Sequence, residues 1–125
     1  MTAWMLVAVA ASGGLGAVLR YLVGRAVPRR SPKGFPWSTF AINVSGSFLL
    51  GVATGLAVVH LLPDEWKVIV GTGFLGGYTT FSTASTETVE LARRGRPGLA
   101  AAYGIGMFAT ALAAAGVGLR VASLL

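Results

Sequence analysis

A run of glycines followed by hydroxyl side chains is the part of this sequence whose residue types could do chemistry. The glycines are Gly71, Gly73, Gly76 and Gly77, and the hydroxyls that follow are Thr79, Thr80, Ser82, Thr83, Ser85, Thr86 and Thr88. Glycine weakens a helix by about 1 kcal/mol relative to alanine, so we expect a helix break near residues 76–80. Backbone groups freed at membrane depth need protein, water or an ion as a partner. The segment 71–88 is therefore the leading candidate for a functional site.

Catalytic constellations are not indicated by this sequence. The four carboxylates, Asp64, Glu65, Glu87 and Glu90, lie at or beyond the ends of uncharged blocks, and the chain has no cysteine. No such block holds paired carboxylates, a nucleophile with a plausible base, or a metal-ligand cluster. What remains is hydroxyls, one amide, aromatic rings and a helix break. These groups suit the selection of an ion by direct contact, so we do not expect an enzyme.

The composition indicates a membrane protein. Of the 125 residues, 54% are hydrophobic and 11% are charged, whereas soluble domains carry about 25% charged residues. The formal net charge is +6, but the basic residues sit between apolar blocks and not along one solvated face. That arrangement is typical of loop charge that controls membrane orientation, and it argues against nucleic-acid binding.

Four blocks are long enough to span a membrane, which takes about 20 mostly apolar residues. We expect spans at about 2–24, 39–62, 66–90 and 98–120, with the break inside the third, in a single all-α domain over 1–125. Gly51 and Gly55, and Gly73 and Gly77, are four residues apart, a spacing that lets helix backbones approach closely in lipid. Four spans enclose little, so we expect the chain to oligomerise.

Polar residues on the other spans have two interpretations each. Asn43 could donate its amide to an anion or bridge two helices. Arg20, near the end of the first span, could snorkel to the interface or stand as a cation at a vestibule. Tyr103 and Thr110, seven residues apart on the fourth span, could form a polar track or pack in the core.

Three motifs resemble the Fluc (CrcB) family of fluoride channels. They are SGGLGAVLRY at 12–21, STFAINVSGSFLLG at 38–51 and GFLGGYTTFSTAS at 73–85, and the resemblance covers all four spans in order. It implies a dimer of two antiparallel four-helix subunits with two separate fluoride pores. It also implies a central structural Na⁺ bound by backbone carbonyls at the breaks in the third spans.

The resemblance assigns roles to individual residues. The carbonyls of Gly76 and Thr80 would bind Na⁺, Arg20 would lie toward the vestibule, and Phe81 would be one of the paired rings that flank each pore. The fluoride pore would be lined by Asn43, Phe81, Ser82, Thr83, Tyr103 and Thr110. Hydroxyls and an amide can replace the water around a small, tightly hydrated anion, and aromatic edges carry partial positive charge.

Ala84 departs from the family pattern, which has a second phenylalanine at that position. In the family each pore takes one ring from each subunit's pair, so a homodimer would lack one ring in both pores. A partner chain that keeps both phenylalanines would complete one pore. We therefore expect a heterodimer with a second Fluc subunit, with a homodimer as the alternative.

The distribution of basic residues also predicts a fixed orientation. Arg20, Arg25, Arg29, Arg30, Lys33, Arg93, Arg94 and Arg96 lie toward one membrane side, and Lys67 and Arg120 lie toward the other. Positive loops stay in the cytoplasm. We expect loops 1 and 3 on the cytoplasmic side of the bacterial plasma membrane and both termini outside.

The expected function is the passive export of fluoride, and two alternatives remain. A non-conducting assembly subunit is compatible with Ala84 and with the charge bias. A small multidrug-resistance-like exporter would need a carboxylate in the first span, and the block from Met1 to Leu19 has none.

Overall fold

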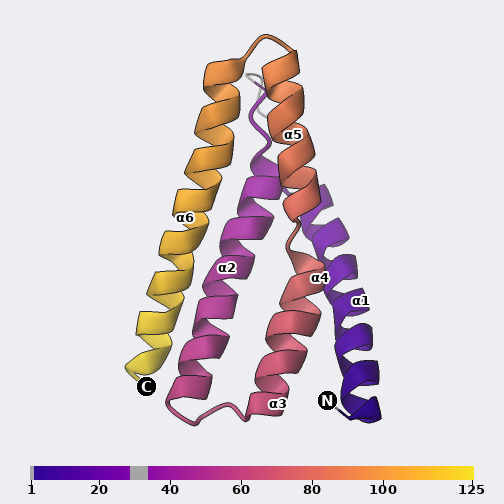
Figure 1. Cartoon of the computed structure of the whole chain (residues 1–125), viewed down its shortest axis with the longest axis vertical. Coiled ribbons are helices and arrows are strands. Elements are labelled where there is room, and N and C mark those ends of the chain that lie inside the picture. Colours follow the sequence, from indigo (N-terminus) through magenta and orange to yellow (C-terminus); the bar gives the residue numbers. More distant parts are fainter. Residues whose placement is uncertain (1, 29–33) are drawn as a thin grey trace.

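The computed structural model describes residues 2–28 and 34–125. The chain runs along the length of the molecule in successive helical segments, each called a path, and the third path, which covers residues 64–93, is built from several shorter helices (Figure 1). Three paths are single helices: α1 (Ala3–Ala26), α2 (Trp37–Val58) and α6 (Pro97–Ser123). Within the described residues, these three helices are long and apolar enough to cross a membrane. The protein is therefore a multi-pass, all-helical membrane protein. The basic residues Arg29, Arg30 and Lys33, which contribute to the charge bias, lie outside the described residues.

The remaining path is broken into segments. It consists of α3 (Asp64–Lys67), the π-helix η1 (Val68–Leu75), α4 (Gly76–Tyr78) and α5 (Phe81–Arg93). The two residues between α4 and α5 are extended, Thr79 with φ −80° and ψ 159° and Thr80 with φ −145° and ψ 113°. A break in the third path was expected near 76–80, and it falls at Thr79–Thr80.

The expectation that the glycines themselves break the helix is wrong. Residues 71–77 stay helical, first as part of η1 and then in α4. Their small size serves close packing: a Cβ on Gly77 would overlap the carbonyl oxygen of Gly13, and one on Gly73 would overlap Ser12 Oγ. Ser12 also donates a hydrogen bond of 3.0 Å to the carbonyl of Ile69, which joins α1 to η1. Gly73 and Gly77 therefore allow this half of the path to pack closely against α1.

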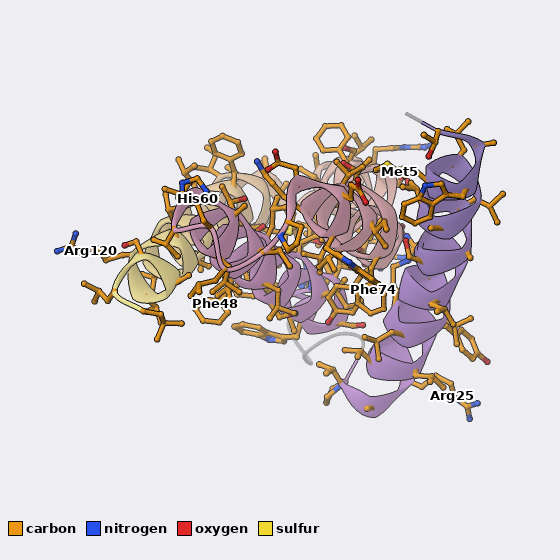
Figure 2. The ribbon with its side chains drawn as sticks, turned by 90° about the horizontal axis from the view of Figure 1, so that it is seen from below. Met5, Arg25, Phe48, His60, Phe74 and Arg120 are labelled. Carbon is orange, nitrogen blue, oxygen red and sulfur yellow. The ribbon has the colours of Figure 1, made fainter. Side chains whose placement is uncertain are left out.

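The break redirects the third path from one neighbour to another. Below it, η1 and α4 pack against α1, and above it α5 packs against α6. The most extensive contact of all joins α2 to α6. Seen from below, α1 and α6 lie at opposite sides with the other helices between them (Figure 2). The break thus lies where the two helix pairs meet.

Small residues also determine the contact between α2 and α6. A Cβ on Gly51 would overlap the carbonyl oxygen of Ala115, and one on Gly55 would lie 2.7 Å from the carbonyl oxygen of Leu119. Both glycine pairs that the sequence singled out therefore lie at close backbone contacts, as predicted. Helix α2, which contacts the break, is therefore also packed closely against α6.

The termini and the turns between helices lie at two opposite ends of the molecule. Both termini and the turn between α2 and α3 lie at one end, and the α5–α6 turn lies at the other (Figure 1). Helix α2 ends at Val58, four residues earlier than the span expected from hydropathy, because His60 adopts a left-handed conformation with φ 61°. Arg93, Arg94 and Arg96 flank the opposite turn. The orientation of these ends across a membrane stays a prediction.

Candidate functional site

An uncharged cavity of about 600 Å³ lies beside the break. It is walled by α2, the third path and α6, and four of the predicted site residues line it: Asn43, Gly76, Thr80 and Phe81. The hydroxyl-bearing residues on its wall are Ser47, Thr79, Thr80, Ser85 and Thr88. None of the described residues that line it is Asp, Glu, Lys or Arg. Such a wall can offer hydrogen bonds to an ion without holding it by a full opposite charge.

Asn43 reaches the break from α2. Its Nδ2 donates to the carbonyl of Thr80 at 2.9 Å, and its Oδ1 accepts from the backbone N–H of Thr80 at 2.8 Å. The second Nδ2 hydrogen faces the sulfur of Met107, at an N···S distance of 3.4 Å. A carboxamide has only two N–H donors. Asn43 was predicted to line the pore, and here both of its donors are engaged within the chain.

The two positions of the phenylalanine pattern differ sharply in exposure. Phe81 is 86% exposed and projects from the start of α5, whereas Ala84 is 4% exposed. Ala84 packs in a cluster with Tyr103 and Met107 of α6. The methyl group at this position therefore lets α5 and α6 approach, while Phe81 remains free to contact another molecule.

Three of the other predicted pore residues lie away from the cavity wall. Tyr103 is fully buried, and its hydroxyl donates to Glu87 Oε1 at 3.2 Å. Its ring also meets Phe35 edge to face, with centroids 5.3 Å apart. Thr110 and Ser82 are exposed, and neither is among the residues that line the cavity. Tyr103 and Thr110 are therefore not brought together on one wall.

Thr83 and Arg20 share a second cavity of about 740 Å³ between α1, the start of α2 and α5. Its wall also carries Arg25, Thr80 and Glu87. Thr80 connects the two cavities: its backbone pairs with Asn43, and its Oγ1 accepts from the backbone N–H of Thr83 at 3.2 Å. That hydroxyl is the N-cap of α5, so the break and the start of α5 are stabilised together.

The two carbonyls predicted to bind Na⁺ have different surroundings. In a continuous helix the carbonyl of Gly76 would accept from the N–H of Thr80, but that N–H is bonded to Asn43. Gly76 is exposed, and its carbonyl lacks its regular donor. The carbonyl of Thr80 is buried and already accepts from Asn43. Carbonyl oxygens suit a hard cation, and Gly76 fits that role more simply than Thr80.

Comparison with known proteins places the chain in a family. A sequence profile described as "CrcB-like protein, Camphor Resistance (CrcB)" matches residues 7–119. The chain belongs to the CrcB family. A relative from Leifsonia xyli subsp. xyli, named fluoride-specific ion channel FluC 1, is 52% identical over 124 residues, which cover 99% of this chain and 90% of the relative. A relative from Nitrobacter winogradskyi, named fluoride-specific ion channel FluC, is 44% identical over 117 residues, 93% of each chain.

The family comparison separates this chain from enzymes. The CrcB relatives carry the names of ion channels, so the family is one of transport proteins and not of catalysts. A third relative, FluC 1 from Symbiobacterium thermophilum, is 50% identical over 94 residues, 74% of each chain. The resemblance predicted from the three motifs is therefore confirmed at the level of the family.

Several residues that line the cavity of this CrcB-family chain were not predicted to form the pore. Ser85 and Thr88 extend the face of α5 that begins at Phe81, and Phe108 adds a second exposed ring from α6. Ser47 lies one helical turn from Asn43 on α2. The spacing 81, 85, 88 is an ordinary helix face and could have been recognised once the helix start at Phe81 was known.

Proposed function

We propose that this chain is a subunit of a fluoride-specific ion channel that lets fluoride leave the cell passively across the bacterial plasma membrane. The observation that carries the proposal is the 52% identity, over 99% of this chain, with a relative of that name. Passive export would relieve fluoride toxicity.

The uncharged cavity supports the proposal. Fluoride gives up bound water only where close donors replace it, and hydroxyls can supply such donors. The hydroxyls of Ser47 and Ser85 line the cavity and donate to no other described residue. Phe81 and Phe108, which are 86% and 71% exposed, add ring edges that attract an anion weakly. We propose that fluoride passes along this wall.

The channel is proposed to be a dimer of antiparallel subunits with two pores. This chain walls the cavity on one side only and leaves it partly open. The ring of Phe81 also has little contact with its own chain. A second subunit would close the cavity and cover that ring. A central Na⁺ at the paired breaks would bind the carbonyl of Gly76, and it would stabilise backbone that lipid cannot satisfy.

Ala84 favours a heterodimer over a homodimer. Its side chain is buried against Tyr103 and Met107, so this chain offers one exposed ring where the family pattern would offer two. A partner with phenylalanine at both positions would complete one pore. The same observation supports a second candidate, an assembly subunit that does not itself conduct.

Fluoride efflux from liposomes tests the function. Vesicles loaded with KF and reconstituted with this chain, with or without a CrcB-family partner that has both phenylalanines, release fluoride to an electrode when valinomycin is added. Vesicles loaded with KCl and vesicles without protein are the controls. Release from the two chains together that exceeds release from the partner alone supports the heterodimer, and release from this chain alone supports the homodimer. No release in either case contradicts conduction and leaves the assembly subunit.

Cysteine labelling tests the proposed orientation. The chain has no cysteine, so Arg93→Cys and Leu124→Cys each introduce a single thiol, one at each end of the bundle. With loops 1 and 3 in the cytoplasm, an impermeant thiol reagent added to intact cells labels residue 124 and not residue 93. Equal labelling of both positions would contradict a fixed orientation.

A further inference from the structure

The side chain of Asn43 pairs with both backbone polar groups of Thr80, as a neighbouring strand would. The two hydrogen bonds measure 2.8 and 2.9 Å, and Thr80 is extended with φ −145° and ψ 113°. Thr80 is only 6% exposed, so neither group is satisfied by bulk water. A carboxamide has the same donor and acceptor as a peptide unit, which is why one side chain can satisfy both.

This pairing decides where the third path can be helical. If the helix continued through the break, the N–H of Thr80 would bond to the carbonyl of Gly76, four residues earlier. Asn43 Oδ1 holds that N–H instead. The bond one residue earlier is still α-helical: the N–H of Thr79 donates to the carbonyl of Leu75 at 2.9 Å. At the end of α4, the first α-helical bond to be lost is therefore the one from the N–H of Thr80 to the carbonyl of Gly76.

Asn43 is placed firmly enough to hold the break. One turn along α2, the position of Gly46 has no room for a Cβ, which would overlap Thr79 and lie 3.2 Å from the ring of Tyr78. Ser45 Oγ lies 2.9 Å from the hydroxyl of Tyr78. The helix that carries Asn43 thus contacts both α4 and the break, and on its other side it is closely packed against α6.

We infer that Asn43 is a positioning residue: by holding the N–H of Thr80, it keeps the carbonyl of Gly76 available to a monovalent cation. Only the cation belongs to the proposed function; the pairing and its effect on Gly76 do not depend on fluoride. Asn43 acts on the cation through the backbone, because its Oδ1, the atom that a cation would contact, accepts from the N–H of Thr80.

Glycine labelling gives a direct readout of this carbonyl. The sequence contains two Gly–Gly pairs, Gly13–Gly14 and Gly76–Gly77. Protein labelled with glycine that carries ¹³C at the carbonyl and ¹⁵N therefore shows two peaks in a one-bond carbonyl–nitrogen NMR correlation. The Gly13 peak is the internal control, and the spectra are recorded without fluoride in liposomes.

The inference predicts how three variants change the Gly76 peak. In Asn43→Ala the N–H of Thr80 returns to Gly76, so the carbonyl signal moves downfield, toward hydrogen-bonded helix, and loses its response to exchange of Na⁺ for N-methylglucamine. In Asn43→Asp a carboxylate still accepts the N–H of Thr80, so the Gly76 signal stays in place. Ser45→Ala, which removes the neighbouring bond to Tyr78, also leaves it in place.

Two results would overturn the inference. One is an unchanged Gly76 peak in Asn43→Ala when the Gly13 peak shows that the protein is folded. The other is a downfield shift in Asn43→Asp, which remains decisive if Asn43→Ala fails to fold. Absence of fluoride flux in the wild-type chain would contradict the proposed function and leave these NMR results unaffected.

Discussion

Replacing Gly16 by alanine tests whether α1 is held against η1 and α4 by the close approach of Gly16 to their backbone. A Cβ at this position would overlap the carbonyl oxygen of Phe74, and it would lie 2.9 Å from the nitrogen of Tyr78 and 3.0 Å from the carbonyl carbon of Phe74. These are backbone atoms, so no flexible side chain can move away. The residues contacted belong to η1 and α4, directly before the break.

The expected cost follows from two opposing terms. Forcing an extra methyl group into a packed site costs about 1–3 kcal/mol, while glycine to alanine inside a helix gains about 1 kcal/mol. Gly14→Ala is the matched control, because it lies in the same helix and its Cβ would meet nothing within 4 Å. The helix term is common to both variants. Their difference therefore reports the clash, about 1–3 kcal/mol.

Reversible unfolding in mixed micelles measures this difference. The fraction of dodecyl sulfate is raised at fixed protein concentration, and the fluorescence of Trp4, Trp37 and Trp66 reports unfolding. Gly16→Ala should unfold at a lower detergent fraction than Gly14→Ala. Unfolding free energies that agree within about 0.5 kcal/mol, the usual scatter between independent sites, would refute the role given to this contact.

Variants at three further residues address the break, the exposed ring and the end of α2. Phe81→Leu should lower fluoride efflux, because the ring is 86% exposed in the single chain and projects into the proposed pore. Unchanged efflux would remove Phe81 from the pore. Thr80→Val removes the hydroxyl that accepts from the N–H of Thr83 and should lower the unfolding free energy by about 1 kcal/mol. Thr80→Ser keeps a hydroxyl and should lower it by less. Equal losses of unfolding free energy in the two variants would contradict the cap. His60→Gly should stabilise by about 1 kcal/mol, because φ is 61°, and His60→Ala should not; the same melting temperature for both would count against strain at this residue.

Hydropathy and glycine spacing predicted much of the fold. Four paths and their approximate bounds follow from the lengths of apolar blocks, because a bilayer requires about 20 such residues. Close packing was predicted at Gly51, Gly55, Gly73 and Gly77. A Cβ at any of these positions would indeed meet a neighbouring helix. Low helix propensity predicted a break near 76–80, and the break falls at Thr79–Thr80, while the glycines before it stay helical.

The candidate site was less accessible to sequence reasoning, because it depends on contacts between distant residues. Asn43 and Thr80 are 37 positions apart, and no local pattern shows that one carboxamide replaces a helix bond. Tyr103 and Thr110 share a helical face by spacing, but only Tyr103 is covered, since α5 packs beside it. The roles of Ser82, Thr83 and Arg20 in ion passage stay predictions.

Fluoride efflux from liposomes that contain this chain and a CrcB-family partner with both phenylalanines tests the central claim most directly. Rapid fluoride release is expected after valinomycin, with no release of chloride from matched vesicles. Less release is also expected when Phe81→Leu replaces the wild-type chain. Fluoride release no faster than from protein-free vesicles, with this chain alone and with the partner, would contradict the claim that the chain forms part of a fluoride channel.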